Sequence, residues 1–173
     1  MKSDFMSAKS HRVTERATAD DVEAIADLNV RAYGEFASAL APGAWELMQK
    51  NLTNVAERFL VSQFFVVRDD QKVVGSVAYG PAGSGDPTLF EADMASVLLL
   101  AVAPEHRARG IAKALTTACI SSARRDDASS IGLFTNELMR AAQHLYRSVG
   151  FRLESELPMR YGVRYFHYVL ALR

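Results

Sequence analysis

The feature that most limits how this chain can fold is an unbroken apolar run from Val97 to Ala103, which stops at Pro104. It completes a stretch, Ala95–Val102, in which positions that would face both sides of a strand are almost all apolar. A strand of this kind must be covered on both faces, so we expect it in the centre of a sheet packed between helices. A run of seven residues is too short to cross a bilayer as a helix.

Hydrophobic periodicity divides the rest of the chain into helical and extended stretches, without internal repeats. The turn at Asp69–Gln71 predicts an antiparallel hairpin, and 157–164 is expected to be a loop between the last two strands. Helices are expected from a capping-box-like start at Thr18 to about Tyr33, from Ala44 to about Glu57, from about Gly110 onward, and over Leu138–Val149. Strands are expected over Arg12–Ala17, Gln63–Arg68, Lys72–Tyr79, Ala95–Val102, Ser130–Phe134, Phe151–Glu156 and Tyr165–Leu172.

Size and charge exclude several classes of protein. The 173 residues suit one domain, which we expect over 12–173, preceded by a loose tail at 1–11. The formal net charge is zero, so we expect neither nucleic acid nor an anionic membrane surface as a partner. The single cysteine, Cys119, excludes an intramolecular disulfide framework and a zinc site built from several cysteines. Without a hydrophobic leader at the N-terminus, a reducing, cytoplasmic setting is the expectation.

The segment that carries chemistry is Leu99–Leu115, where the apolar strand leads into a basic turn and a helix opens at Gly110. The first N–H groups of a helix have no internal partner, and the helix dipole is positive there, so this end can bind an anion. Arg107, Arg109 and Lys113 add positive charge around it, while Gly110 and Ala112 leave the backbone accessible. Taken by themselves, these residues fit an ordinary strand–helix connection with solvated charges equally well.

Two motifs resemble those of a known family. Arg107-x-x-Gly110-x-Ala112 after an apolar strand resembles the acyl-CoA pyrophosphate motif of the GNAT acetyltransferases. Asn136 and the segment Ala141–Phe151, which contains Leu-Tyr and Gly-Phe, resemble a second motif that follows the fifth strand. The resemblance implies a mixed α/β fold: a mostly antiparallel sheet of about seven strands with a splayed parallel pair, flanked by about four helices. It also implies that 12–173 is one acyl-CoA N-acyltransferase domain.

The same resemblance implies roles for particular residues. Free backbone groups of Leu100 and Val102 would bind the pantetheine arm and the thioester carbonyl of acetyl-CoA, and Asn136 would hydrogen-bond the pantetheine arm. Tyr146 would lie beside the thioester sulfur, where a phenol that is protonated at neutral pH can act as general acid. No metal is expected. The pyrophosphate would be held by backbone N–H groups of Arg107, Ala108, Arg109, Gly110, Ile111, Ala112 and Lys113.

The general base is not identified by the sequence. Many relatives carry a Glu where this chain has Ser96, and Glu91 and Asp93 just upstream are candidates only through a chain of water molecules. Both carboxylates also fit solvated loop positions, and an amine can lose its proton without a dedicated side chain. Cys119 lies on the apolar face of its helix, so we interpret it as a core residue and not as a nucleophile.

These observations predict an acetyl-CoA-dependent N-acetyltransferase that acts on the primary amine of a small molecule. A non-catalytic acyl-CoA-binding regulatory module and a protein N-terminal or lysine acetyltransferase remain as alternatives. The expected partners are the amine and, at most, a second copy of the chain in a homodimer. Six side chains are expected around the acceptor: Tyr33, Phe36, Trp45, Arg160, Tyr161 and Arg164. They could bind an aromatic or acidic acceptor, and they fit ordinary packing and solvated loop charges equally.

Overall fold

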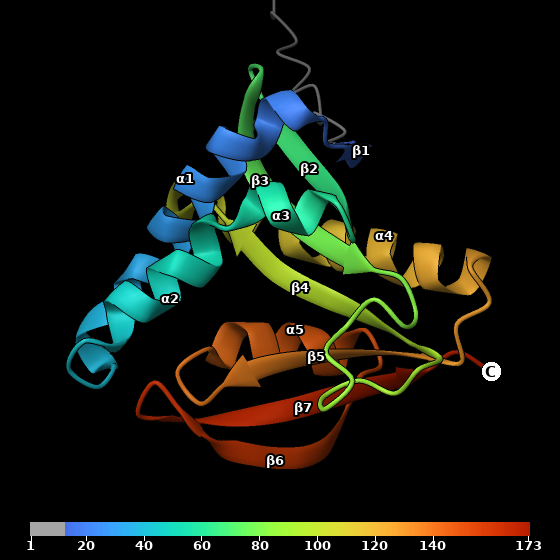
Figure 1. Ribbon diagram of the computed structural model, residues 1–173. Helices are drawn as coiled ribbons and strands as arrows, with labels where there is room; N and C mark the ends of the chain where they lie inside the picture. Colours follow the sequence, from blue (N-terminus) through green and yellow to red (C-terminus); the bar gives the residue numbers. More distant parts are fainter. Residues whose placement is uncertain (1–12) are drawn as a thin grey trace, which may run out of the picture.

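The computed structural model describes residues 13–173, so the expected tail and Arg12 lie outside the described residues. These residues form a seven-stranded sheet with the order β1-β2-β3-β4-β5-β7-β6 (Figure 1). The strands are β1 Glu15–Arg16, β2 Gln63–Asp69, β3 Lys72–Gly80, β4 Met94–Val102, β5 Ser130–Asn136, β6 Arg152–Arg160 and β7 Val163–Ala171. The α-helices are α1 Val22–Tyr33, α2 Ala44–Thr53, α3 Val55–Phe59, α4 Ile111–Arg125 and α5 Arg140–Ser148.

The apolar strand β4 lies in the centre of the sheet, as its composition predicts. It pairs with β3 antiparallel and with β5 parallel, and every other pair in the sheet is antiparallel. The β4–β5 pairing covers only three positions, from Met94 opposite Ser130 to Ser96 opposite Gly132. Beyond Ser96 the two strands separate (Figure 1). The splayed parallel pair is therefore confirmed.

A β-bulge lies in β4 just past the point where the strands separate. Leu98 is opposite Ala78 and Ala101 is opposite Ser76, so two residues of β4 face the single residue Val77. One of the two, Leu99, has a positive φ of 53°. A leucine in this region costs about 1–3 kcal/mol, and a bulge turns the following backbone groups away from the regular ladder. The sequence offers no signal for this bulge, because leucine is not a residue that favours positive φ.

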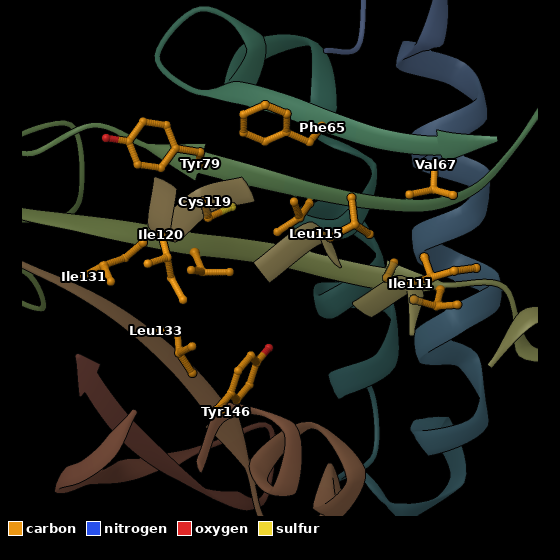
Figure 2. Close-up of a cluster of buried hydrophobic side chains, with 14 of the residues drawn as sticks. Phe65, Val67, Tyr79, Ile111, Leu115, Cys119, Ile120, Ile131, Leu133 and Tyr146 are labelled. Atoms are coloured by element: carbon orange, nitrogen blue, oxygen red, sulfur yellow. The ribbon is translucent and has the colours of Figure 1, made fainter. Parts of the chain in front are cut away.

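Hydrophobic clusters cover both faces of the sheet, which explains why β2 to β5 are so apolar. The larger cluster packs α4 against the sheet and includes Leu115, Cys119 and Ile131 (Figure 2). The smaller cluster packs α1 and α3 on the opposite face through Ile25 and Val55. Cys119 has no exposed surface and forms no disulfide, which confirms it as a core residue.

Two expected boundaries are wrong. The helix expected from Ala44 to Glu57 is broken at Asn54, so residues 13–173 form five α-helices where about four were expected. The loop expected over 157–164 is mostly strand: β6 runs to Arg160 and turns into β7 through Tyr161 and Gly162, both at positive φ. Pro158 is tolerated in β6 because this strand is at the edge of the sheet.

Candidate active site

A cavity of about 570 Å³ lies where β4 and β5 separate, and it brings together residues from four elements that are distant in sequence. Its wall combines the end of α1, the stretch from the end of β4 through the first turn of α4, the end of β5, and the inner side of α5. Nine of the residues predicted to bind acetyl-CoA line it: Leu100, Val102, Arg107, Ala108, Gly110, Ile111, Ala112, Lys113 and Tyr146. Arg109 and Asn136, also predicted, do not line it.

The N-terminus of α4 has the geometry of an anion cradle. Ala108 and Gly110 both adopt positive φ, at 57° and 77°, and such alternation turns successive N–H groups toward one side. The first N–H group of this region with a helical acceptor is that of Ala114, which donates to the carbonyl of Gly110. The N–H groups of the first three helical residues, Ile111 to Lys113, therefore have no helical acceptor.

Open space lies in front of this cradle. A Cβ built on Gly110 would meet no atom within 4 Å, so the backbone is accessible at that position. Lys113 and Arg109 are exposed beside it. Free N–H groups, an accessible backbone and nearby cations fit the pyrophosphate of an acyl-CoA.

Arg107, which the motif assigns to the pyrophosphate, already has partners within the protein. Its guanidinium donates to the carbonyl of Ala32 at 3.0 Å and forms an ion pair with Glu35 at 2.7 Å. Its own N–H already donates to Pro104. The arginine therefore joins the turn to the end of α1 and supplies neither a free N–H nor a free charge to an anion.

Tyr146 is the buried residue of α5, with 5% of its surface exposed. Its ring packs edge-on against Phe151, with 5.8 Å between the ring centroids, and Figure 2 shows its hydroxyl pointing toward β4. The hydroxyl has no hydrogen-bond partner within residues 13–173. Burial, with smaller contributions from Tyr33 and Cys119, raises the pKa of this phenol, so it stays protonated at neutral pH.

A smaller cavity of about 180 Å³ adjoins the first. Both cavities are lined by Tyr33, Phe134, Thr135 and Met139, which therefore form a shared wall. Of the expected acceptor residues, Tyr33, Arg160 and Tyr161 line the smaller cavity and Phe36 lines the larger one. Trp45 and Arg164 line neither, since Trp45 lies beside Gly34 and Arg164 is paired with Glu137 at 3.1 Å.

Asn136 lies on this smaller cavity and not on the larger one. Its side-chain oxygen accepts a hydrogen bond from the N–H of Leu138 at 3.0 Å, and its amide donates to the hydroxyl of Tyr165 at 3.4 Å. The side chain therefore shapes the turn from β5 to α5. Sequence reasoning missed Arg58, Asn51 and Tyr165, which also line this cavity, because no local motif marks them.

No carboxylate lies where many relatives carry the general base. Ser96 is buried, and its hydroxyl has no partner within the described part of the chain. Glu91 and Asp93 are exposed and line neither of the two cavities. Glu91 instead borders a third cavity, of about 390 Å³, together with Glu154 and His167.

Among residues 13–173, no group of three or more His, Cys, Asp or Glu side chains is arranged to hold a metal ion. Over the same range, every helix is too short or too polar to cross a bilayer.

Comparisons with known proteins agree with the fold. Residues 22–151 match the model of the Acetyltransferase (GNAT) family. Human N-acetyltransferase 8B is 33% identical over 132 residues, which cover 68% of this chain and 57% of that protein. The chain therefore spans little more than half the length of the curated relatives it matches.

Solved structures share the fold. A GNAT-family acetyltransferase from Staphylococcus aureus superposes with a TM-score of 0.72 at 19% identity, covering 93% of this chain and 99% of that chain. The PaiA N-acetyltransferase from Thermoplasma acidophilum, in complex with coenzyme A, superposes with a TM-score of 0.71 at 13% identity, covering 90% and 96%.

Proposed function

The chain belongs to the GNAT acetyltransferase family, and from this premise we propose that it transfers the acetyl group of acetyl-CoA to a primary amine of a small molecule. One observation carries the proposal. A single cavity joins the free N–H groups at the start of α4 to the Tyr146 hydroxyl, along the edge of β4 that β5 leaves unpaired. The N–H groups and the unpaired edge of β4 suit the binding of an acyl-CoA. The hydroxyl suits the release of its thiolate.

Acetyl-CoA, when bound, supplies the activated acetyl group as a thioester. The N–H groups of Ile111, Ala112 and Lys113 would donate to its pyrophosphate, and the α4 dipole would favour that negative charge. Backbone groups at Leu100 and Val102, beyond the last β4–β5 pair, would hold the pantetheine arm. They would also stabilise the negative charge that develops on the thioester oxygen when the amine attacks.

Tyr146 would act as the general acid. Attack by the amine expels a thiolate, which needs a proton, and the phenol carries one at neutral pH because burial raises its pKa. Its hydroxyl has no competing partner within residues 13–173 and would donate to the sulfur.

The smaller cavity would receive the amine. Its volume of about 180 Å³ has room for a small acceptor, and the wall it shares with the larger cavity would bring the amine to the acetyl group. The single, buried Cys119 supports a reducing, cytoplasmic setting, and we propose 12–173 as one domain.

The experiment is incubation of the protein with acetyl-CoA and a mixed library of amines, followed by mass spectrometry. Loss of the thioester together with newly acetylated amines is the expected result. One observation, the absence of a carboxylate at Ser96, favours the alternative of a non-catalytic acyl-CoA-binding module. Acetyl-CoA that is retained without turnover on any amine would support that alternative and overturn the proposal.

A further inference from the structure

Two arginines from different elements border the smaller cavity. Arg58 lies in α3 and Arg160 ends β6. Within residues 13–173, neither guanidinium has a carboxylate within 4.0 Å, whereas Arg31, Arg68, Arg107 and Arg164 are all paired. The cavity lining contains no Asp or Glu. Two cations therefore face a cavity that offers them no counter-charge.

The environment of Arg58 makes this arrangement costly without an anion. Its Nε is buried and has no hydrogen-bond partner in the described part of the chain. An unsatisfied donor on a charged group loses its hydration without compensation. Burial, and then repulsion by Arg160, lower the pKa of Arg58. A carboxylate in the cavity would satisfy the donor and relieve the repulsion.

Arg160 is held at the cavity by its neighbours. Its guanidinium lies 5.1 Å from the centre of the Tyr161 ring, and the Tyr161 hydroxyl accepts a hydrogen bond of 2.6 Å from Asn51. The charge of Arg160 acts on Asp86, an exposed residue that accepts hydrogen bonds from Thr88 and does not line the cavity. The charge of Arg160 is thus available to a ligand.

The position of the arginines fixes the orientation of that ligand. The wall shared by the two cavities, with Tyr33 and Thr135, is where an amine would meet the acetyl group. Arg58 and Arg160 line only the smaller cavity. A small molecule in this space would direct its amine to the shared wall and its other end to the guanidiniums.

We propose, on the basis of the function proposed above, that the acceptor is an amine that also carries a carboxylate, bound by Arg58 and Arg160. Guanidinium–carboxylate hydrogen bonds are charge-assisted and directional, so they would select such amines over uncharged analogues. Neither arginine lies in a family motif, and Arg164, the other arginine expected near the acceptor, is paired with Glu137.

The test compares amines that differ only by the carboxylate: L-methionine with 3-(methylthio)propylamine, and L-phenylalanine with 2-phenylethylamine. Release of CoA gives kcat/KM for each. A charge-assisted hydrogen bond contributes about 1.5–3 kcal/mol, so we expect the amino acids to be favoured by about 10- to 100-fold. Arg58→Gln and Arg160→Gln should each reduce that preference by about tenfold or more. Arg152→Gln, an exposed substitution at the start of β6, is the control.

Binding measured without turnover separates this proposal from the function on which it rests. L-methionine and 3-(methylthio)propylamine are titrated calorimetrically into the protein saturated with CoA. Binding of L-methionine alone, lost in Arg58→Gln and Arg160→Gln, would support the carboxylate site even if no amine is acetylated. Equal kcat/KM within each pair, equal binding of both probes, or binding of neither would overturn it. Arg160→Gln, being exposed, keeps the test decisive if Arg58→Gln fails to fold.

Discussion

The hydroxyl of Tyr33 donates a hydrogen bond of 3.0 Å to the backbone carbonyl of Leu100, and so joins the end of α1 to the bulge in β4. Leu100 directly follows Leu99, the residue at positive φ, and both Tyr33 and Leu100 line the larger cavity. Tyr33 also lines the smaller cavity. The phenol thus connects the backbone proposed to hold the thioester with the wall that the acceptor would contact.

Tyr33→Phe removes this hydrogen bond and keeps the ring. A hydrogen bond of this kind contributes about 1 kcal/mol, so we expect that loss in the free energy of unfolding. Because the bulge loses a support beside the acyl donor, KM for acetyl-CoA should rise about threefold or more. Tyr79→Phe is the matched control: its buried phenol donates to Asp126, away from both cavities. An unchanged KM in Tyr33→Phe would show that the bulge keeps its geometry without the hydrogen bond from Tyr33.

Tyr146→Phe tests the general acid. General acid catalysis contributes about 100- to 10,000-fold, and a thiolate is already a fair leaving group, so kcat should fall by roughly 100-fold or somewhat less. An interaction made mainly in the transition state leaves KM for acetyl-CoA little changed. Steady-state kinetics with Tyr168→Phe as control check this, since the Tyr168 hydroxyl is bonded to Arg147 and Gln143 instead. Full turnover by Tyr146→Phe would show that Tyr146 is a packing residue and not the general acid.

Gly110→Val tests the pyrophosphate cradle, with Gly83→Val as a control for backbone strain. The two glycines have nearly the same φ, 77° and 79°, so valine is strained equally at both. Only at Gly110 would the side chain occupy the open space in front of the N–H groups of α4. Calorimetry should show at least a tenfold loss of CoA affinity in Gly110→Val and little change in Gly83→Val. Equal affinities would locate the phosphate site elsewhere.

CoA should raise the midpoint of thermal unfolding. A ligand that binds only the folded state stabilises it by about 2.7 kcal/mol at one hundred times its dissociation constant. The shift should grow with CoA concentration and shrink in Gly110→Val. A midpoint that does not respond to millimolar CoA would contradict acyl-CoA binding.

The imidazole of His167 should make the fold sensitive to mild acid. Burial lowers its pKa from about 6.5, opposed by Glu154 and Glu91, and its Nε2 is buried without a partner in the described range. As the pH falls below about 6.5, His167 binds a proton in the unfolded chain but not in the folded protein. The free energy of unfolding therefore decreases as the pH falls, until the pH reaches the pKa of His167 in the folded protein. His167→Phe should flatten this decline in urea unfolding, with His144→Gln on the exposed side of α5 as control. An unchanged decline in His167→Phe would assign the acid sensitivity to other groups.

The sequence by itself determined the parts of this protein whose signals are local. The apolar run ending at Pro104 specified a central strand, because a strand with two apolar faces is stable only between two layers. The glycine that opens α4 specified the cradle, because a helix N-terminus and its free N–H groups lie within a few residues. Leu145, Tyr146 and Gly150 are also a local signal, since they lie within six residues of one another. They predicted α5 and the burial of Tyr146.

Only the tertiary structure decided what depends on pairing between distant segments. Arg107 and Arg164 read as free charges in the sequence, yet Glu35 and Glu137 are near them only after folding. The bulge at Leu99 follows from the register between β3 and β4, which no residue type at that position signals. The smaller cavity is lined by residues of α1, α2, α3, β5 and the β6–β7 hairpin, which only folding brings together. No motif marks Arg58 or Arg160 in its own segment of the sequence. Only packing brings both side chains to the same cavity, whose lining contains no carboxylate.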